Sequence, residues 1–350
     1  MSSATAIVTG ATGWLGTRLI ECLTRGLPDG PTLTTAGPHR RIRAVLEPGA
    51  SRASLSPLAS FIDFFEADLA DADALTPVFR GVAGGTVFHC AGVAHPLRTA
   101  SYYRVNVEGT RALLAAARLA DIRRFVHVSA DSVLGTNATP EEPFDELSPY
   151  QPTHHYARSK MLAERAVWES ACSGGAQAVI VRPATLYGPH HPPRRSRFFR
   201  LIRQGRMPLF GGGDNRRSLA YVDNVCQALM LAEGIERARG QTYWIADERP
   251  YAMRDIYQII RTVLARDFAL KAPPPPNAPR LFATGARLTL RALEGLGFHS
   301  HALSVMAELD RNITCRIRKA VDELGYAPKV DLAEGMRRSI RWMLENGETL

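Results

Sequence analysis

The first half of the chain alternates between two patterns of apolar positions. Short runs rich in valine, isoleucine and phenylalanine are typical of buried strands, whereas apolar side chains that recur every three to four residues predict helices. We expect strands at 6–8, 42–46, 61–67, 86–89, 125–129 and 178–181, and helices at 14–26, 71–79, 105–120 and 155–170. This alternation predicts an α/β fold, a doubly wound parallel sheet whose ligand lies at the carboxyl ends of the strands.

Three glycines follow the first strand, and the first predicted helix begins among them. Gly10 would allow a tight turn, Gly13 would let the backbone approach a pyrophosphate, and Gly16 would let the helix pack closely on the sheet. The helix N-terminus would offer unpaired N–H groups and a positive dipole end to the phosphates. Glycine-rich turns occur in other α/β proteins too, but the strand before this one and the helix after it favour a dinucleotide site.

The second strand ends on an acidic residue, Glu47. An acidic residue at this point of a βαβ nucleotide fold accepts hydrogen bonds from the adenosine ribose and repels a 2′-phosphate, which favours NAD over NADP. A segment of glycine, proline and threonine at 26–41 predicts a surface insertion that places Glu47 later than usual. Arg43 and Arg52 lie near enough in sequence to keep NADP as the alternative, and Glu47 could instead be a solvated glutamate at a strand end, but we expect NAD.

Tyr156, Lys160 and Ser129 form the candidate catalytic group. Tyr156 and Lys160 are four residues apart in a predicted helix, so their side chains share one face. An ammonium group beside a phenol favours the phenolate and lowers its pKa from the usual value of about 10. Tyr156 could then exchange a proton with a carbonyl or alcohol as hydride passes to or from a nicotinamide. A tyrosine and a lysine four residues apart can also occur by chance on a solvated helix face. The glycine turn earlier in the chain favours a catalytic role for this pair.

Composition and charge narrow the class of protein. The chain has 350 residues, 45% hydrophobic and 22% charged, which is long enough for a large α/β domain with an added lobe. Its formal net charge of +9 comes from scattered arginines, without a lysine-rich arm, and this argues against a nucleic-acid partner. No signal-type segment and no apolar run of about 18 residues is found, so we expect a cytoplasmic protein.

Cysteines and histidines predict no metal site. The five cysteines form no C-x-x-C pair and are expected to be reduced thiols. The histidine pairs at 154–155 and 190–191 lack the i, i+4 spacing of a helical metal site. We therefore expect these four histidines to lie in solvated loops.

Five motifs of the chain resemble those of a known family. The segments TGATGWLG, VFHCAG, NVEGT, YARSK and VRPATLYGP are similar to motifs of the extended short-chain dehydrogenase/reductases, also called the NAD-dependent epimerase/dehydratase family. Three later segments resemble the 3β-hydroxysteroid dehydrogenase and dihydroflavonol reductase branch more than the nucleotide-sugar epimerases: RSLAYVDNVCQALMLA, GQTYWIADERPYAMRDIY and KAVDELGYAPKVDLAEGMRRSIRWM. The resemblance covers essentially the whole chain and implies a Rossmann fold.

The resemblance also implies which residues meet the cofactor. Asp68 and Leu69 would flank the adenine, and Lys160 would also hold the nicotinamide ribose. The backbone after Gly13 would face the pyrophosphate. With the glycine turn and the strand ends, the predicted cofactor-binding residues are Gly10, Gly13, Trp14, Leu15, Gly16, Glu47, Asp68, Leu69, Ala91, Lys160 and Pro183.

The third catalytic hydroxyl departs from the family pattern. The family usually places it three residues before a V-Y-G-like element, where this chain has Ala130. Ser129 fits the spacing of the reductase branch and is our candidate, with Ser132 as the alternative. The dehydratases of the family carry an Asp-Glu pair in this loop, whereas the chain has Asp131 followed by Ser132, so the missing glutamate argues against dehydration.

The second half of the chain predicts a smaller, discontinuous substrate lobe. A basic, proline-rich loop at 190–197 and a glycine turn at 211–214 interrupt the strand and helix pattern, and 273–276 predicts a stiff extended connector. We expect a dinucleotide-binding domain at 1–183 plus 218–247, and a substrate lobe at 184–217 plus 248–350.

The segment 280–309 is a basic, amphipathic helical stretch. A helix of this kind can lie in a lipid interface with arginines at the headgroups, which would bring an apolar substrate from a membrane. The alternative is that its apolar face packs on the lobe, as in most globular proteins. Peripheral membrane contact is therefore kept as a partner hypothesis. The other partner hypotheses are a small-molecule substrate and a homodimer. The apolar positions of the segment 280–309 are Leu281, Phe282, Leu288, Leu293, Leu296 and Phe298, and they are interleaved with the basic positions Arg280, Arg287 and Arg291.

These observations predict an NAD(P)-dependent oxidoreductase that interconverts a secondary alcohol and a ketone on an apolar small molecule such as a steroid, lipid or polyketide. The first alternative is a nucleotide-sugar epimerase that retains bound NAD, in which Arg216 and Arg217 would bind the diphosphate. The second is a non-catalytic module that senses the dinucleotide. Such a module would be expected to lose Tyr156 and Lys160, which this chain keeps.

Overall fold

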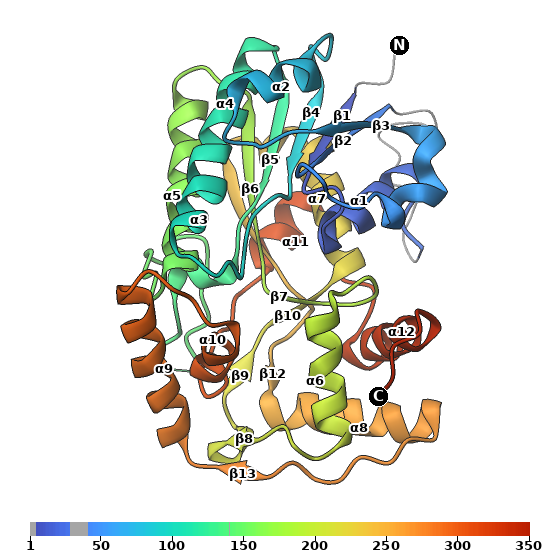
Figure 1. Ribbon diagram of the computed structural model, residues 1–350, viewed down its shortest axis with the longest axis vertical. Coiled ribbons are helices and arrows are strands. Elements are labelled where there is room, and N and C mark those ends of the chain that lie inside the picture. The colour runs from blue at the N-terminus through green and yellow to red at the C-terminus, as the bar shows by residue number, and fades with distance from the viewer. Residues whose placement is uncertain (1–4, 29–40, 140) are drawn as a thin grey trace.

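Seven parallel strands form the central sheet of the computed structural model, which describes residues 5–28, 41–139 and 141–350 (Figure 1). The strand order reverses between β1 and β4, and a doubly wound sheet opens a crevice for a ligand at such a point. The predicted α/β fold with a doubly wound parallel sheet is confirmed. In spatial order the strands are β11 (Gln241–Ile245), β6 (Gln177–Pro183), β5 (Arg124–Val128), β4 (Thr86–His89), β1 (Ala6–Thr9), β2 (Ile42–Leu46) and β3 (Ile62–Glu66).

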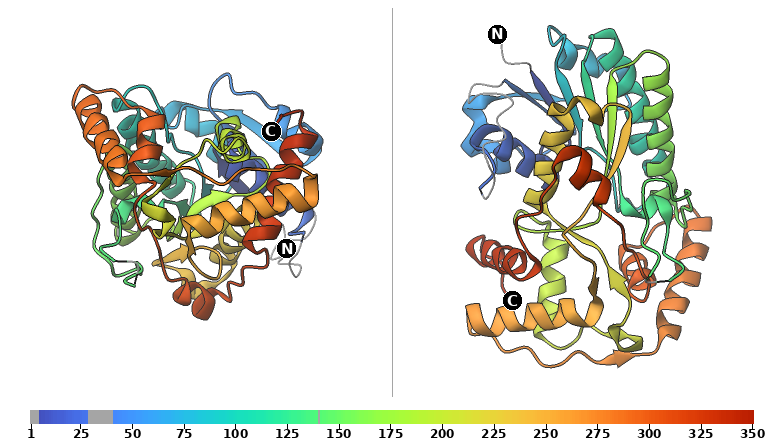
Figure 2. Two further views of the ribbon diagram at one scale, coloured as in Figure 1. Left: turned by 90° about the horizontal axis from the view of Figure 1, so that it is seen from below. Right: turned by 180° about the vertical axis from the view of Figure 1, so that it is seen from behind.

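Helices cover both faces of this sheet (Figure 2). α1 (Trp14–Arg25) and α7 (Val222–Gly234) pack together on one face. α2 (Ala72–Phe79), α4 (Gly109–Leu119) and α5 (His155–Cys172) cover the other face. Because both faces are covered, the central strands β4 and β5 are buried along their whole length.

A second, smaller body lies beyond the carboxyl ends of the strands (Figure 1). It has its own apolar core, distinct from the two cores beside the large sheet. Its pieces come from separate stretches of the chain, and three two-stranded sheets join them. Its helices are α6 (Pro193–Arg203), α8 (Met253–Phe268) and α12 (Leu332–Glu345), and its strand pairs are β7 (Thr185–Tyr187) with β10 (Leu219–Tyr221), β9 (Arg216–Arg217) with β12 (Tyr251–Ala252), and β8 (Leu209–Phe210) with β13 (Asn277–Ala278). α11 (Arg318–Leu324) instead packs on β11 and α7.

The segment predicted as one amphipathic stretch forms a helical hairpin, α9 (Arg280–Gly295) and α10 (His301–Glu308). Gly297, at φ +82°, interrupts it in a left-handed conformation that favours glycine. Five of the six apolar positions named for this stretch are exposed, and Arg287 and Arg291 line a pocket. The membrane hypothesis stays a prediction. The exposed apolar residues are Leu281, Phe282, Leu288, Leu296 and Phe298.

Other predicted elements differ in extent. The helix expected at 105–120 begins earlier and contains a π-helical turn, since α3 (Ala100–Tyr103) continues through Arg104–Glu108 into α4. The loop expected at 190–197 gives way to α6 at Pro193, because proline is favourable at the first helical position. The insertion expected at 26–41 lies largely outside the described residues.

The described ranges show neither a membrane-spanning helix nor a cluster of metal-binding side chains. No helix there is long and apolar enough to cross a bilayer. Those same ranges contain no group of three or more His, Cys, Asp or Glu side chains that could hold a metal ion.

Candidate functional site

The glycine turn between β1 and α1 is packed so closely that side chains would not fit. Gly10 has φ +65°, and a Cβ atom there would lie 2.7 Å from the Cα atom of Ala91. A Cβ atom on Gly16 would lie 2.1 Å from the carbonyl oxygen of Gly10. No side chain in the described ranges caps the first turn of α1, so its N–H groups can meet an anionic ligand. The turn therefore brings the predicted cofactor residues Gly10, Gly13, Gly16 and Ala91 together at the carboxyl end of the sheet.

Trp14 and Leu15, the first two residues of α1, differ in what their side chains contact. Trp14 Nε1 donates a hydrogen bond to the Pro189 carbonyl oxygen at 2.6 Å. This bond ties the start of α1 to the segment that enters the smaller body. Leu15 is buried, so only its backbone can face a ligand. Pro183 is the last residue of β6, at the same end of the sheet.

Glu47 is exposed directly after β2, as an acidic ribose ligand would need to be. The two arginines that kept NADP as an alternative already have acceptors. Arg43 Nη1 donates to the Val78 carbonyl oxygen at 2.7 Å, and Arg52 Nη2 lies 2.8 Å from Glu66 Oε1. Both guanidinium groups therefore already have an acceptor, and neither is free to bind a 2′-phosphate.

Asp68 and Leu69 follow β3 and lie beside the π-helical turn. Asp68 forms an ion pair with Arg104 and accepts a hydrogen bond from the Ala70 N–H group at 3.0 Å. Leu69 is buried against Gly109, where an added Cβ atom would lie 3.0 Å from the Cβ atom of Leu69. Arg104 was not predicted, because its partner is 36 residues away in the sequence.

Tyr156 and Lys160 lie in the first turns of α5, and Ser129 follows β5. Lys160 Nζ donates a hydrogen bond to the Val128 carbonyl oxygen at 2.7 Å. Burial lowers the pKa of Lys160 to about 8, against the opposing charge of Glu164. The Oγ atoms of both Ser129 and Ser132 are buried without a hydrogen-bond partner, so each can serve a ligand. The choice between these two hydroxyls stays a prediction.

The expected lowering of the Tyr156 pKa is not found. Burial raises this pKa, and the carboxylates of Asp131 and Glu308 raise it further. The physical reason lies in the orientation of Lys160, whose ammonium group is held by the Val128 carbonyl oxygen. In this state of the site the phenol is protonated at neutral pH.

Asn106 positions the tyrosine helix against the loop that follows β4. Its side chain accepts from the Val93 N–H group at 2.9 Å and donates to the Ser159 Oγ atom at 2.9 Å. Ser159 Oγ in turn donates to the Tyr156 carbonyl oxygen at 2.8 Å. The π-helical turn carries Asn106, and such turns often occur at functional sites. A buried asparagine in an alanine-rich helix was the available signal for this residue.

A charged cluster that the sequence did not predict lies over the site. His154 Nε2 is 3.3 Å from Glu308 Oε1 of α10, and Arg217 Nη1 is 3.8 Å from Glu308 Oε2. Burial lowers the pKa of His154, but the hydrogen bond and charge of Glu308 outweigh it and raise this pKa overall. Burial and the Glu308 charge raise the pKa of Asp131 to about 6. The ring of His154 stacks on Tyr156, with 6.1 Å between ring centroids.

The expectation of solvated histidines is wrong for two of the four. His154 is largely buried and caps α5 by accepting a hydrogen bond from the Ala157 N–H group at 3.3 Å. His191 is 2% exposed and packs against Trp14 and Trp342. Both histidines face elements that are distant in the sequence, which local spacing does not reveal.

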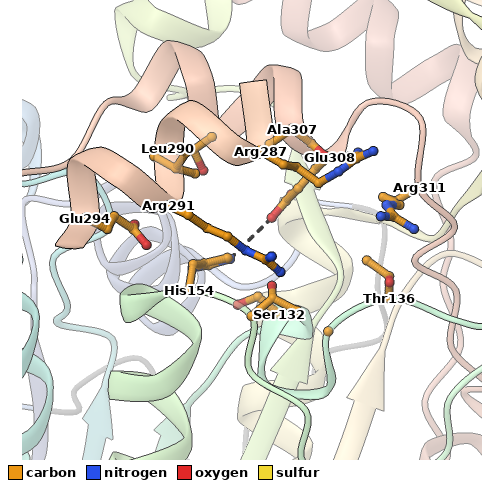
Figure 3. Close-up of a pocket in the computed structure, with 13 residues that line it drawn as sticks. Ser132, Thr136, His154, Arg287, Leu290, Arg291, Glu294, Ala307, Glu308 and Arg311 are labelled. Carbon is orange, nitrogen blue, oxygen red and sulfur yellow. Dashed lines mark hydrogen bonds and ion pairs between the residues drawn. The ribbon is translucent and has the colours of Figure 1, made fainter. Parts of the chain in front are cut away.

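A pocket of about 100 Å³ lies between this cluster and the helical hairpin (Figure 3). Ser132 and His154 form its floor, and α9 and α10 supply Arg291 and Glu308. Figure 3 shows the Arg291 side chain pointing from α9 toward His154 and Ser132. Most of the side chains that line it are polar or charged, which the prediction of an apolar small-molecule substrate did not anticipate.

Comparisons with known proteins agree with this arrangement. The family model described as "NAD dependent epimerase/dehydratase family" matches residues 6–246. A protein of Sinorhizobium fredii, y4nL, is 37% identical over 100% of this chain and 98% of its own. A 4-hydroxy-2-methyl-3-oxo-4-farnesyl-3,4-dihydroquinoline-1-oxide ketoreductase of Stigmatella aurantiaca is 30% identical over 94% of this chain and 93% of its own. The crystal structure of DesIV, a dTDP-glucose 4,6-dehydratase from Streptomyces venezuelae with NAD and TYD bound, is 25% identical with a TM-score of 0.74, covering 98% of this chain and 97% of that one.

Proposed function

Because the chain belongs to the NAD-dependent epimerase/dehydratase family, we propose that it is an NAD(P)-dependent oxidoreductase that interconverts a secondary alcohol and a ketone on a small molecule. The observation that carries this proposal is the placement of Tyr156 and Lys160 at the start of α5, next to the strand end where the Ser129 Oγ atom is buried and unpartnered. A non-catalytic sensor of the dinucleotide would not need these side chains at the ligand-binding end of the sheet.

The residues around the glycine turn fit a dinucleotide. Added Cβ atoms on Gly10 and Gly16 would collide with the backbone of Ala91 and Gly10, so only glycine allows the tight turn and the close packing of α1 that a dinucleotide site needs. The N–H groups at the start of α1 would hold the pyrophosphate, and Glu47 would accept hydrogen bonds from the adenosine ribose, which favours NAD. Bound there, NAD would accept or supply the hydride of the reaction. Asp68, Leu69, Ala91, Lys160 and Pro183 would complete the cofactor site.

Tyr156 would exchange the proton of the reaction. Its phenol is protonated at neutral pH, which is the form needed to donate a proton to a ketone oxygen during reduction. The Ser129 Oγ atom would hydrogen-bond the same oxygen and orient it. Lys160, with a pKa of about 8, is mostly an ammonium ion at neutral pH, so its positive charge would favour the phenolate after proton transfer.

The substrate class follows from the lining and from one relative. We propose a substrate with an apolar body and a polar end, bound by the lobe formed from 184–217 and 248–350. The relative from Stigmatella aurantiaca is named a ketoreductase of a farnesyl compound, which supports the reductase branch and an apolar body. The charged pocket beside Ser132 supports a polar end.

The second candidate is conversion of a nucleotide sugar with retained NAD. It is favoured by the similarity to DesIV, whose name gives that class of substrate. Arg217, which would bind the diphosphate, donates to the Glu308 carbonyl oxygen at 2.5 Å and lies near the Glu308 carboxylate. Ser132 stands where the dehydratases carry glutamate. These two features favour the oxidoreductase.

The test is to measure NADH consumption by the purified protein with a panel of ketones. Tyr156→Phe should lower kcat roughly 100- to 10,000-fold while NAD binding stays nearly unchanged, because the ring still packs but the proton is gone. Tyr257→Phe, which removes a hydroxyl from α8 that donates to the Pro208 carbonyl oxygen, is the matched control. Near-normal turnover in Tyr156→Phe would refute the assignment. NAD that stays bound through purification, with nucleotide sugars converted and no NADH consumed, would favour the second candidate.

A further inference from the structure

We propose that the pocket between η3 (Asp131–Leu134) and the α9–α10 hairpin binds an anionic group of the substrate, a carboxylate or a phosphate, through Arg291 and Arg311. This inference rests on the proposed oxidoreductase function and names the polar end of its substrate. It depends on which charges in the pocket are already paired, on an unpartnered hydroxyl, and on the size of the cavity.

Both carboxylates of the pocket have cationic or hydrogen-bonding partners of their own. Glu294 Oε1 lies 3.0 Å from Nδ1 of His299. Glu308 lies 3.3 Å from Nε2 of His154 and is also close to Arg217. Neither carboxylate is therefore left to neutralise the remaining arginines.

The three arginines of the pocket differ in their pairing. Arg287 Nη1 lies 2.7 Å from Asp310 Oδ1 and also donates to the Ala307 carbonyl oxygen. Arg311 reaches the same Asp310 oxygen only at 3.9 Å. Arg291 has neither a hydrogen-bond nor an ion-pair partner within the described part of the chain. Arg291 and Arg311 are both exposed, and they bring to this pocket two positive charges that have no close carboxylate partner.

An unpartnered donor faces the same space. The Ser132 Oγ atom is buried and has no hydrogen-bond partner, and Ser132 is 9% exposed. A buried hydroxyl without a partner needs a ligand or water to satisfy it. Figure 3 shows Arg291 and Ser132 pointing toward one another from opposite walls, with Arg311 beside Thr136. Two guanidinium groups and a hydroxyl are the donor set that a carboxylate or phosphate requires.

The pocket is large enough for a small anionic group. Its volume of about 100 Å³ is several times the ~10–15 Å³ that a single water needs. A carboxylate or phosphate group therefore fits that space. The anionic end of the substrate would lie in this pocket and the reacting carbon outside it.

The pocket is contiguous with the reacting centre. Its floor residue His154 stacks on Tyr156, and Ser132 follows the Ser129 strand end by three residues. An anion held by Arg291 would therefore fix the distance from the charged end of the substrate to the carbon oxidised or reduced at Tyr156. Arg291 and Arg311 would act as specificity-determining residues.

The first test measures anion binding without turnover. Inorganic phosphate and acetate are titrated into the purified protein by calorimetry at constant ionic strength, because salt screens exposed charges. Arg291→Gln and Arg311→Gln should each lower the affinity for whichever anion binds more tightly by about ten- to a hundredfold, as expected for loss of a charged hydrogen bond. The matched control is Arg341→Gln on α12, an exposed arginine on a helix away from the hairpin (Figure 1). Binding of neither anion, or equal binding by all variants, would overturn the proposal.

The second test uses turnover and separates this inference from the proposed function. Keto acids and keto phosphates are compared with their neutral methyl esters, and the acid should have the lower KM in the wild type but not in Arg291→Gln. Turnover of the neutral methyl esters with a KM no higher than that of the anionic substrates would overturn the proposed anion site and leave the proposed oxidoreductase function intact. Absence of turnover with every ketone would overturn the proposed function, while calorimetry would still decide the anion site.

Discussion

Glu164 forms a buried ion pair whose loss should be measurable in the stability of the whole fold. Arg182, on β6, donates from Nε to Glu164 Oε1 at 3.0 Å and from Nη2 to Glu164 Oε2 at 2.7 Å. The two side chains are 4% and 0% exposed. The hydroxyl of Tyr150 also donates to Glu164 at 2.6 Å. This pair joins β6 to α5, the helix that carries Tyr156 and Lys160.

The expected effect of Glu164→Gln is large because it removes one charge and leaves the other buried. Breaking a buried pair from one side costs about 3–5 kcal/mol, since the remaining guanidinium has lost both water and its counter-charge. At an unfolding entropy of about 2.1 cal/mol/K per residue, that loss lowers Tm by ~4–7 °C for a chain of 350 residues. The double variant Glu164→Gln with Arg182→Met should recover most of the loss, because it removes the orphaned charge as well.

The measurement is thermal and urea unfolding of the wild type, both variants and a surface control. The control is Asp322→Asn, which breaks the exposed ion pair between Arg318 and Asp322 on α11 and should leave Tm unchanged. A loss below about 1 kcal/mol for Glu164→Gln would show that the buried pair is not what holds β6 to α5. A double variant no more stable than the single one would refute the argument from the orphaned charge.

Two further predictions concern pH and cofactor choice. Because the pKa of Asp131 is raised from 3.8 to about 6, the native protein binds this proton more tightly than the unfolded chain between those pH values, and the ionised carboxylate costs stability above pH 6. Asp131→Asn should therefore have a higher Tm than the wild type at pH 7.5, with the gain shrinking as pH falls through 6 toward 4; a gain that grows at low pH contradicts this. The exposed Glu47 should make kcat/KM higher with NAD than with NADP, and Glu47→Ser should narrow that ratio. A wild-type preference for NADP would mean that Arg43 or Arg52 governs the ribose site.

Local patterns in the sequence were sufficient for the sheet and the glycine turn. Both features depend on residues that are consecutive in the sequence. In the glycine turn, a strand, three glycines and a helix all lie within 6–25. The predicted strand ends differ from the observed ones by at most two residues, because buried apolar runs stop where the backbone leaves the sheet. β11 was not predicted as a strand, although it lies in the segment 218–247 that we assigned to the dinucleotide-binding domain.

The charged cluster and the pocket could not be predicted in this way. Glu308 meets His154 across 154 positions of the sequence, and Arg287 and Arg291 reach the pocket only because the hairpin folds over η3. Single-sequence periodicity reports which face of a helix is apolar, but not what that face packs against. The same limit explains the two buried histidines, which were expected to be solvated.

The position of β11 in the sheet has a consequence for synthesis of the chain. β11 pairs with the outer edge of β6, yet the polypeptide leaves the sheet at residue 183 and returns only at residue 241. At 5–20 residues per second, a ribosome needs roughly 3–12 s to make the intervening segment. Throughout that interval the nascent chain exposes an unpaired, apolar strand edge, which is a template for association with other chains. A fragment that ends between residues 183 and 241 therefore keeps this edge permanently, and we expect it to form an aggregation-prone sheet of six strands instead of a smaller nucleotide-binding domain.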